Sequence, residues 1–237
     1  MLSKAKIDRL LPRIVKLFDG MIGMTRWRKL NELLLRVADN TDNFFFIEIG
    51  SNDGVIHDPL YQHIIHNQWR GILIEPVKYY FNRLKANYSA NPNLIFENIA
   101  ISTTDETRDI YRIREGVDHL PAWCNGLGSF YKEVLLKHQW AIPNIEDYII
   151  TEPVVCMSLP SLLSKHRVEV LDVLLIDTEG YDYEIVKQLD FARYRPKLLL
   201  YEHKHLTPSD RQSCELLLQS QGYRLATHFS NSLAYRA

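Results

Sequence analysis

The sequence predicts an α/β fold in which helices cover both faces of a mostly parallel sheet. Short apolar runs such as residues 44–49 and 71–74 lack the polar alternation of a half-exposed strand, so they fit strands buried on both faces. Segments with helical spacing of apolar residues separate these runs, which is the pattern of parallel strands joined by right-handed crossovers. Several runs also end in acidic residues beside glycine, as expected where strands open onto a ligand crevice.

The first 40 residues predict a helical extension. Apolar residues recur at helical spacing over residues 7–18 and again over residues 27–37, and glycines separate the two stretches. We expect two helices here, most simply as cover for the core. The expected organisation is therefore an extension over residues 1–40 and one α/β domain over residues 41–237.

Strand and helix patterns alternate through the rest of the chain. Strands are expected at residues 44–49, 71–75, 94–101, 173–176 and 197–201, and helices at about 56–67, 77–88, 159–166, 182–188 and 208–219. A closing pair of strands is expected near 223–229 and 233–235. The alternation stalls over residues 103–157, where 109–114 and 154–157 resemble short strands. A stretch this long inside a compact domain is more often functional than inert, so we assign this insertion to the substrate side.

Composition excludes several classes of function. Lys and Arg total 28 against 29 Asp and Glu, and the net charge of -1 gives no field that would gather nucleic acid or an anionic membrane. Cys124, Cys156 and Cys214 are odd in number and widely spaced, unlike a disulfide framework or a zinc site. No stretch resembles a signal peptide or approaches the roughly 20 apolar residues of a membrane helix. We expect a cytoplasmic protein with no nucleic-acid partner and no membrane span; the oligomeric state stays open.

The turn after the first strand is the most informative motif, and it reads Glu48-Ile49-Gly50-Ser51-Asn52-Asp53-Gly54. Its glycine spacing differs from G-x-G-x-x-G, whose amides cradle a pyrophosphate at a helix N-terminus. Two acids at this turn would repel a diphosphate and attract the ammonium and sulfonium of S-adenosyl-L-methionine. The turn therefore favours a methyl donor over NAD, with Glu48 and Asp53 as the acids that would attract its positive charge.

The ends of the next two strands complete the expected cofactor site. Glu75 ends the second strand, where an acid can accept both hydroxyl protons of a ribose, and Pro76 helps to end that strand. On the third strand, small Ala100 leaves room for a flat ring, Asn98 could position the nucleoside, and the amide of Ile99 could meet an adenine edge. The alternatives are a strand-terminal acid facing water and an ordinary buried strand with a turn asparagine.

Acidic residues and histidine follow the fourth and fifth strands. Asp177 and Glu179 should point at the reacting end of the ligand, because the crevice of such a sheet lies beyond the carboxyl ends of its strands. Asp182 is expected to stabilise the start of the next helix. His203 is a candidate general base and Glu202 could orient it, although alternation places the two on opposite faces. Surface histidines in a loop are the alternative.

A divalent metal is a further alternative at this edge. Asp177, Glu179, Glu202 and a histidine could hold Mg²⁺ or Ca²⁺, and a metal would help to ionise a substrate hydroxyl. No tight ligand spacing supports a metal, so we assign no metal ligands.

Four blocks in order resemble the FkbM-type methyltransferase family, a branch of the Rossmann-like S-adenosylmethionine-dependent enzymes. They are residues 46–54, 74–76, 98–102, and 175–182 followed by 196–203. The family's G-A-N-x-G reads Gly50-Ser51-Asn52-Asp53-Gly54 here. The resemblance implies a Rossmann-like seven-stranded sheet and O-methyl transfer, with the methionine portion near Gly50 to Asp53, the ribose on Glu75 and the adenine near Asn98 to Ala100.

Three functions thus remain for the structure to address. The leading one is an S-adenosylmethionine-dependent O-methyltransferase acting on a hydroxyl of a small molecule or sugar, with Asp177, His203 or a metal receiving the proton or stabilising the alkoxide. The second is an NAD-dependent oxidoreductase on a related fold, against which the missing G-x-G-x-x-G counts. The third is a non-catalytic binding protein with a degenerate cofactor pocket. The sequence does not identify the acceptor.

Overall fold

The computed structural model of the chain describes residues 24–117, 119–124 and 126–236. Its largest element is a seven-stranded sheet in the order β10-β11-β9-β8-β1-β2-β3. These strands are β1 (Phe45–Ile49), β2 (Arg70–Ile74), β3 (Leu94–Glu97), β8 (Val173–Ile176), β9 (Leu198–Glu202), β10 (Arg224–His228) and β11 (Asn231–Tyr235). Neighbours from β3 to β9 pair in parallel, whereas β11 runs antiparallel to β9 and β10. The predicted α/β fold with a mostly parallel seven-stranded sheet is confirmed.

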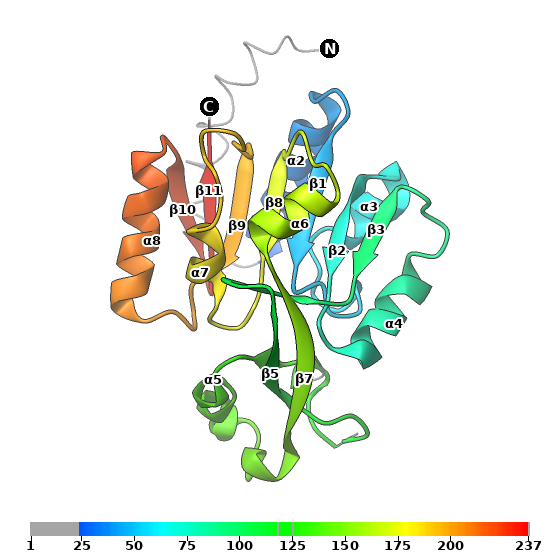
Figure 1. Cartoon of the computed structure of the whole chain (residues 1–237), viewed down its shortest axis with the longest axis vertical. Coiled ribbons are helices and arrows are strands. Elements are labelled where there is room, and N and C mark those ends of the chain that lie inside the picture. Colours follow the sequence, from blue (N-terminus) through cyan, green and yellow to red (C-terminus); the bar gives the residue numbers. More distant parts are fainter. Residues whose placement is uncertain (1–23, 118, 125, 237) are drawn as a thin grey trace.

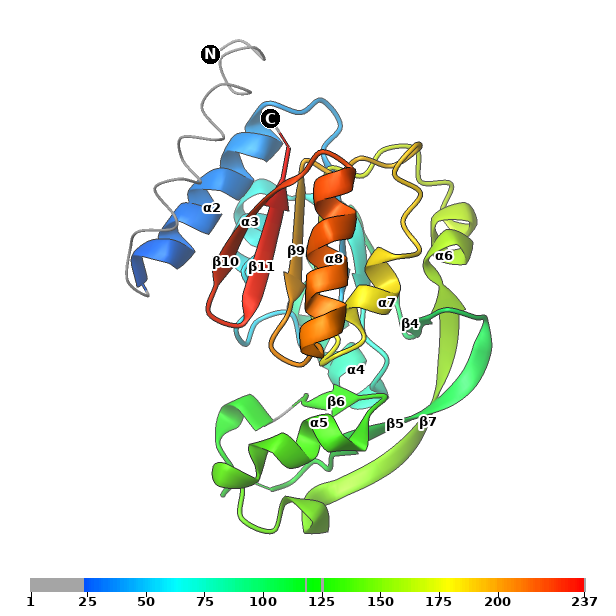
Figure 2. The ribbon, with the colours of Figure 1, turned by 90° about the vertical axis from the view of Figure 1, so that its left-hand side faces the viewer.

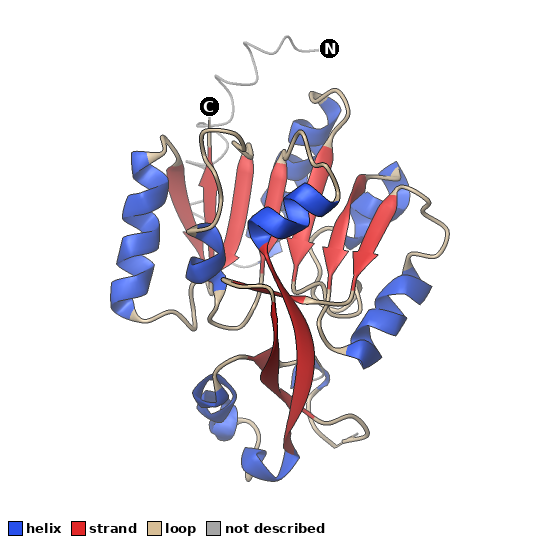
Figure 3. Ribbon diagram, viewed as in Figure 1, coloured by secondary structure: helices blue, strands red, loops and turns tan. Residues whose placement is uncertain are grey.

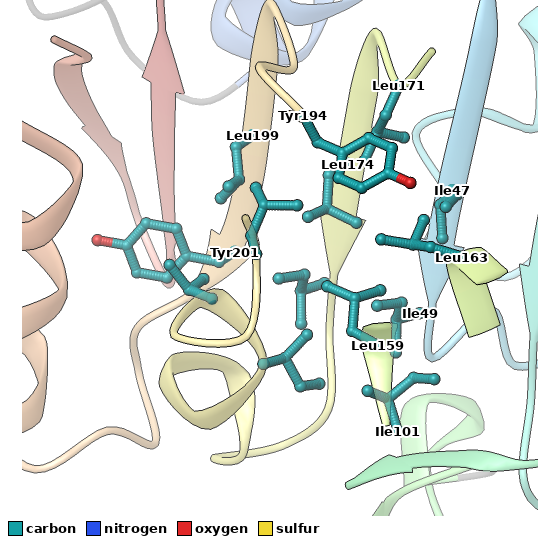
Figure 4. Close-up of a cluster of buried hydrophobic side chains, with 14 of the residues drawn as sticks. Ile47, Ile49, Ile101, Leu159, Leu163, Leu171, Leu174, Tyr194, Leu199 and Tyr201 are labelled. Carbon is teal, nitrogen blue, oxygen red and sulfur yellow. The ribbon is translucent and has the colours of Figure 1, made fainter. Parts of the chain in front are cut away.

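Helices cover both faces of this sheet (Figures 1 and 2). One face carries α2 (Met24–Asp39), α3 (Tyr61–Asn67) and α4 (Lys78–Asn87), and the other carries α6 (Leu159–Lys165), α7 (Asp182–Val186) and α8 (Pro208–Ser220). Alternation along β1 sends Phe46 into the first core and Ile47 and Ile49 into the second, where they meet Leu159 and Leu163 of α6 (Figure 4). None of the described helices is long and apolar enough to cross a membrane.

The described part of the N-terminal extension is the helix α2. Leu30, Leu33, Leu34 and Val37 are buried on its core-facing side, as predicted for a covering helix. The helix predicted over residues 7–18 lies outside the described residues.

Hydroxyl caps explain where α6 and α8 begin. The amide of Ser161 donates to Ser158 Oγ at 3.3 Å, and the amide of Asp210 donates to Thr207 Oγ1 at 3.1 Å. Each helix also has a proline in its first turn, where no intrahelical amide bond is lost.

The insertion forms a second, four-stranded sheet in the order β4-β7-β5-β6. Its strands are β4 (Ala100–Ser102), β5 (Glu106–Ile113), β6 (Gly128–Ser129) and β7 (Ile149–Ser158). The long antiparallel ribbon of β5 and β7 projects below the main sheet, beyond the ends of its parallel strands (Figure 3). One helix, α5 (Lys132–Leu136), and the 3₁₀ segments η1 (Ala122–Cys124), η2 (Lys137–Trp140) and η3 (Ile145–Tyr148) pack beside it.

Two strand predictions need correction here. The single strand predicted over residues 94–101 is wrong, because the chain leaves the main sheet after Glu97 and enters the second sheet at Ala100. Asn98 holds the crossing, since its Nδ2 donates to the carbonyl oxygens of Glu75 and Pro76 at 2.9 and 2.8 Å. The short strands predicted at 109–114 and 154–157 are instead strands of eight and ten residues.

Position 71 requires glycine, because β1 and β2 approach each other too closely there to leave room for a side chain. A Cβ on Gly71 would lie 2.5 Å from the carbonyl oxygen of Phe46 and 2.6 Å from its ring. We expect Gly71→Ala to lower the free energy of unfolding by about 2 kcal/mol, as overpacking of a rigid core does. Urea denaturation followed by circular dichroism measures this loss.

Gly128→Ala is the matched control, because the nearest atom to its Cβ would be 3.7 Å away, an ordinary contact. Its unfolding free energy should stay within about 0.5 kcal/mol of the parent's. Equal losses in the two variants would contradict the packing argument.

Candidate active site

A cavity of about 280 Å³ lies where β1, β2 and β8 end, between the main sheet and the insertion. Main-sheet residues on its wall include Glu48, Gly50, Ser51, Asn52, Asp58, Glu75, Pro76, Asp177, Glu179 and Lys204. The chain from Ile99 onward supplies the rest, including Ile99, Ala100, Trp123, Leu127, Phe130 and His138. Three of the five strand ends singled out from the sequence, those of β1, β2 and β8, therefore meet at one cavity.

The turn after β1 is locked between its two neighbouring strands. Gly50 has a φ of +87°, and a Cβ there would lie 1.9 Å from the carbonyl oxygen of Asp177. The amides of Gly50 and Ser51 both donate to the carbonyl of Ile74, at 3.0 and 2.9 Å. Only glycine fits this position, because a side chain would separate β1 from β8.

Backbone amides hold the side chain of Glu75 in place, because each of its carboxylate oxygens accepts one hydrogen bond. The amide of Asn52 donates to Oε2 at 2.9 Å and the amide of Val77 donates to Oε1 at 2.8 Å. Burial raises the pKa of Glu75 to about 7, against the lowering effect of these two amides. Glu75 lines the cavity, and a carboxylate oxygen can accept more than one hydrogen bond, so Glu75 fits the predicted role of accepting hydroxyl protons from a ribose.

Glu48 and Asp58 form a buried acid pair that lines the same cavity. The two side chains hydrogen-bond, and burial followed by the charge of Asp58 raises the pKa of Glu48 well above its usual range. Burial also raises the pKa of Asp58 to about 6, although the amide of Leu60 and the hydroxyl of Tyr88 donate to it. Two acids in contact disfavour a second negative charge and titrate as a pair. Within the described part of the chain Glu48 Oε2 has no hydrogen-bond partner, so the pair suits an ammonium group.

A second group of titratable side chains lies beyond β8 and β9. His205 Nε2 is 3.0 Å from Glu179 Oε2 and 3.8 Å from Glu202 Oε2. Asp177 is exposed, but only toward the cavity, whose walls limit its hydration; this desolvation raises its pKa well above the usual range, and Glu179 and Asp182 add to the effect. Burial likewise raises the pKa of Glu202, and the charge of Asp177 adds to it.

Four predicted site residues do not line the cavity: Asp53, Asn98, Glu202 and His203. Asp53 turns away from it, because its Oδ1 accepts from the amides of Val55 and Ile56 at 3.0 Å each, and Arg83 pairs with its other oxygen. Asn98 supports the chain crossing described above. His203 lies on the far side of β9, where its Nδ1 is 2.9 Å from Ser232 Oγ, so the structure does not support it as the general base.

Asp182 has the structural role expected of it, though in a different form. Its carboxylate accepts from the hydroxyl of Thr178 at 2.8 Å and from the amide of Glu202 at 2.9 Å. It thereby ties the turn after β8 to the end of β9, instead of capping α7. Burial raises the pKa of Asp182 to about 7.

Sequence reasoning missed Asp58, Lys204 and His138 on the cavity wall. Asp58 lies in an irregular loop before α3, and His138 lies in a short 3₁₀ segment of the insertion. Neither segment has a periodicity or motif that would point to the site. Lys204 follows the strand that ends in Glu202, so its position just beyond a strand end was the one available signal.

The Methyltransferase FkbM domain family matches residues 48–225 of the 237-residue chain. The chain belongs to the FkbM methyltransferase family. This FkbM-family protein is thus an S-adenosylmethionine-dependent methyltransferase, and the residues around the cavity fit that cofactor: Glu75 offers acceptors for ribose hydroxyls and Glu48 offers an unpartnered oxygen for the ammonium. The match gives no support to the oxidoreductase alternative.

Solved methyltransferases are similar at low identity. They include precorrin-6y C5,15-methyltransferase from Geobacter metallireducens GS-15 (11% identity, 88% of this chain and 89% of that chain, TM-score 0.42). The N-terminal domain of human METTL16 in complex with SAH is another (14%, 91% and 72%, TM-score 0.44). A third is ribosomal protein L11 methylase from Lactobacillus delbrueckii subsp. bulgaricus (7%, 90% and 80%, TM-score 0.42). No curated protein matches the FkbM-family chain.

Glu75 gives the cofactor site a pH dependence with a defined sign. Because its pKa is raised to about 7, the carboxylate is mostly protonated below that pH and accepts two hydroxyl protons only above it. We expect the affinity for S-adenosylhomocysteine to rise between pH 6 and pH 8. Glu75→Gln should weaken binding roughly 10- to 100-fold, since a hydrogen bond to a charged group contributes roughly 1.5–3 kcal/mol.

Isothermal titration calorimetry across this pH range tests both statements. The rise with pH should be smaller in Glu75→Gln, where the Glu48–Asp58 pair still titrates, and unchanged in Glu169→Gln, which alters an exposed acid away from the cavity. A Glu75→Gln protein with the parent's affinity and pH profile would remove Glu75 from the cofactor site.

Proposed function

We propose that this methyltransferase transfers its methyl group to a hydroxyl of a small molecule or sugar. The observation that carries the proposal is that one cavity holds both the cofactor turn with Glu75 and a set of acids beyond β8 that can receive a proton. A hydroxyl acceptor must lose its proton as the new bond forms, so it needs such a group within reach.

Asp177 is the residue we assign as general base. Its side chain opens onto the cavity, and its pKa is raised well above the usual range, which makes the carboxylate a stronger base. Lys204 acts in the opposite direction, since its charge lowers the pKa of Asp177. The two together can receive a hydroxyl proton and stabilise the resulting negative oxygen.

Alignment of the acceptor with the methyl group contributes more to catalysis in this proposal than the strength of the base. The bound cofactor supplies an electrophilic methyl group on a sulfonium, and holding reactants in line can contribute on the order of 7 kcal/mol. Trp123, Leu127 and Phe130 form an apolar wall contributed by the insertion. We assign this wall to the acceptor, because it lies opposite the strand ends that hold the cofactor residues.

The acids of the cavity also admit a cationic amine as acceptor, which makes N-methyl transfer the competing outcome. An acceptor panel of phenols, sugars and amines, incubated with S-adenosylmethionine, separates the two. Mass spectrometry should find methylated products among the hydroxyl compounds. Methylation confined to the amines would contradict the proposal.

Asp177→Asn should lower kcat on the best hydroxyl acceptor by about 10²- to 10⁴-fold, the usual contribution of a general base. The affinity for S-adenosylhomocysteine should change less than about 3-fold, because the cofactor contacts remain. Steady-state kinetics and calorimetry measure the two quantities. Asp147→Asn, an exposed change in the insertion, serves as the matched control. Full activity in Asp177→Asn would rule out this residue as the base.

A further inference from the structure

We propose that His138, Glu179 and His205 form a binding site for one divalent transition-metal ion of the Zn²⁺ class at the acceptor end of the cavity. One ligand atom from each of these residues lies within 4.8 Å of the other two. The residues come from three separate segments: η2 of the insertion, the turn after β8 and the loop after β9. Two imidazoles and one carboxylate are the donor set of catalytic zinc sites that keep an open position.

The strongest support is a concentration of buried polar atoms without hydrogen bonds. His138 is 4% exposed and His205 is 6% exposed. Among the described residues, His138 Nε2, His205 Nδ1 and Glu202 Oε2 have no hydrogen-bond partner. His205 Nε2 and Glu179 Oε2 lie 3.0 Å apart as an ion pair, but neither atom makes a hydrogen bond there. Buried polar atoms are normally paired, so such atoms gathered at one point indicate a ligand that binds them together.

The backbone holds Glu179 toward the two histidines. Glu179 has a φ of +52°, a conformation that residues with side chains seldom adopt. Ser129 Oγ of the insertion donates to the carbonyl of Glu179 at 2.7 Å and stabilises this conformation. Gly180 then lets the loop carrying His205 pack closely, since a Cβ on it would lie 3.4 Å from both His205 Cβ and Val134 Cγ2.

The distances require only a small contraction to reach metal-ligand geometry. Zinc bonds to nitrogen and oxygen are about 2.1 Å long and point to the corners of a tetrahedron, so neighbouring ligand atoms lie about 3.4 Å apart. Histidine ligands favour zinc, cobalt, nickel or iron over Mg²⁺, which prefers oxygen ligands alone.

A metal at this point would lie beside the reacting groups. Glu179 and His138 both line the cavity, and Glu179 also lies within 4.8 Å of Asp177 and Glu202. An acceptor hydroxyl bound at the open position would become more acidic and would pass its proton more readily to Asp177. This role rests on the proposed O-methyl transfer, whereas the binding of the metal does not.

Metal binding is tested on the full-length protein after chelation and dialysis. Calorimetry with Zn²⁺ and absorption spectroscopy with Co²⁺ should show one ion per chain, with cobalt bands typical of nitrogen ligands. His138→Ala and His205→Ala should each weaken binding at least about 100-fold, since loss of outer-shell partners alone costs 10- to 100-fold. His66→Ala, which removes an exposed histidine of α3, should bind the metal as the parent does.

Binding of S-adenosylhomocysteine shows that each variant is folded and should be unchanged. No uptake of Zn²⁺ or Co²⁺, uptake unaffected by both histidine variants, or binding of Mg²⁺ alone would each overturn the site. If the protein binds the metal but methylates no hydroxyl compound, the metal site is supported and the proposed O-methyl transfer is contradicted. Methylation at the parent's rate in the chelated protein would remove the metal's role in the reaction.

Discussion

Four neighbouring strands of the main sheet each carry an inward-facing carboxylate at or near the carboxyl end: Glu48 on β1, Glu75 after β2, Asp177 after β8 and Glu202 on β9. Burial is the largest cause of a raised pKa for every one of them. So many acids in one place are stable only if they share protons, accept backbone hydrogen bonds or meet a cation. Glu48 is hydrogen-bonded to Asp58, and Glu75 accepts backbone hydrogen bonds. The remaining acids make the cavity a site for a positively charged ligand.

The close approach of the turn after β1 to β8 makes this concentration possible. Gly50 brings the turn after β1 against the backbone of Asp177, so Glu75 and Asp177 line one cavity. The insertion then covers the cavity from the other side with Trp123 and Phe130, and its Ser129 donates to the carbonyl of Glu179. The same segment therefore supplies both an apolar wall of the cavity and a contact that holds one of its acids.

The parts of the fold that the sequence predicts well are those governed by burial on both sides. The strands from residues 44–49, 71–75 and 173–176 are continuous apolar runs, and the structure has them within one residue of the predicted bounds at each end. The prediction of one strand over residues 94–101 was wrong because two strands of different sheets follow each other there, with only Asn98 and Ile99 between them. Apolar periodicity cannot show that a chain changes sheets, since both halves are apolar.

The site residues also fall into those that topology places and those that local contacts place. Glu75 and Asp177 could be placed because the ends of parallel strands converge, a rule that depends on topology alone. Asp53 and His203 were misplaced because the direction of a side chain beyond a strand end depends on local hydrogen bonds, to the amides of Val55 and Ile56 in one case and with Ser232 in the other. His138 reaches the cavity through tertiary packing of the insertion, for which the sequence holds no periodic signal.

The central claim is that acids around a glycine turn select a cationic methyl donor over a phosphorylated coenzyme. Isothermal titration of the parent protein at neutral pH with S-adenosylmethionine and, separately, with NAD tests it most directly. The account predicts saturable heat with S-adenosylmethionine, weakened by Glu48→Gln, and none with NAD. Saturable binding of NAD, or no binding of S-adenosylmethionine at millimolar concentration, would contradict it.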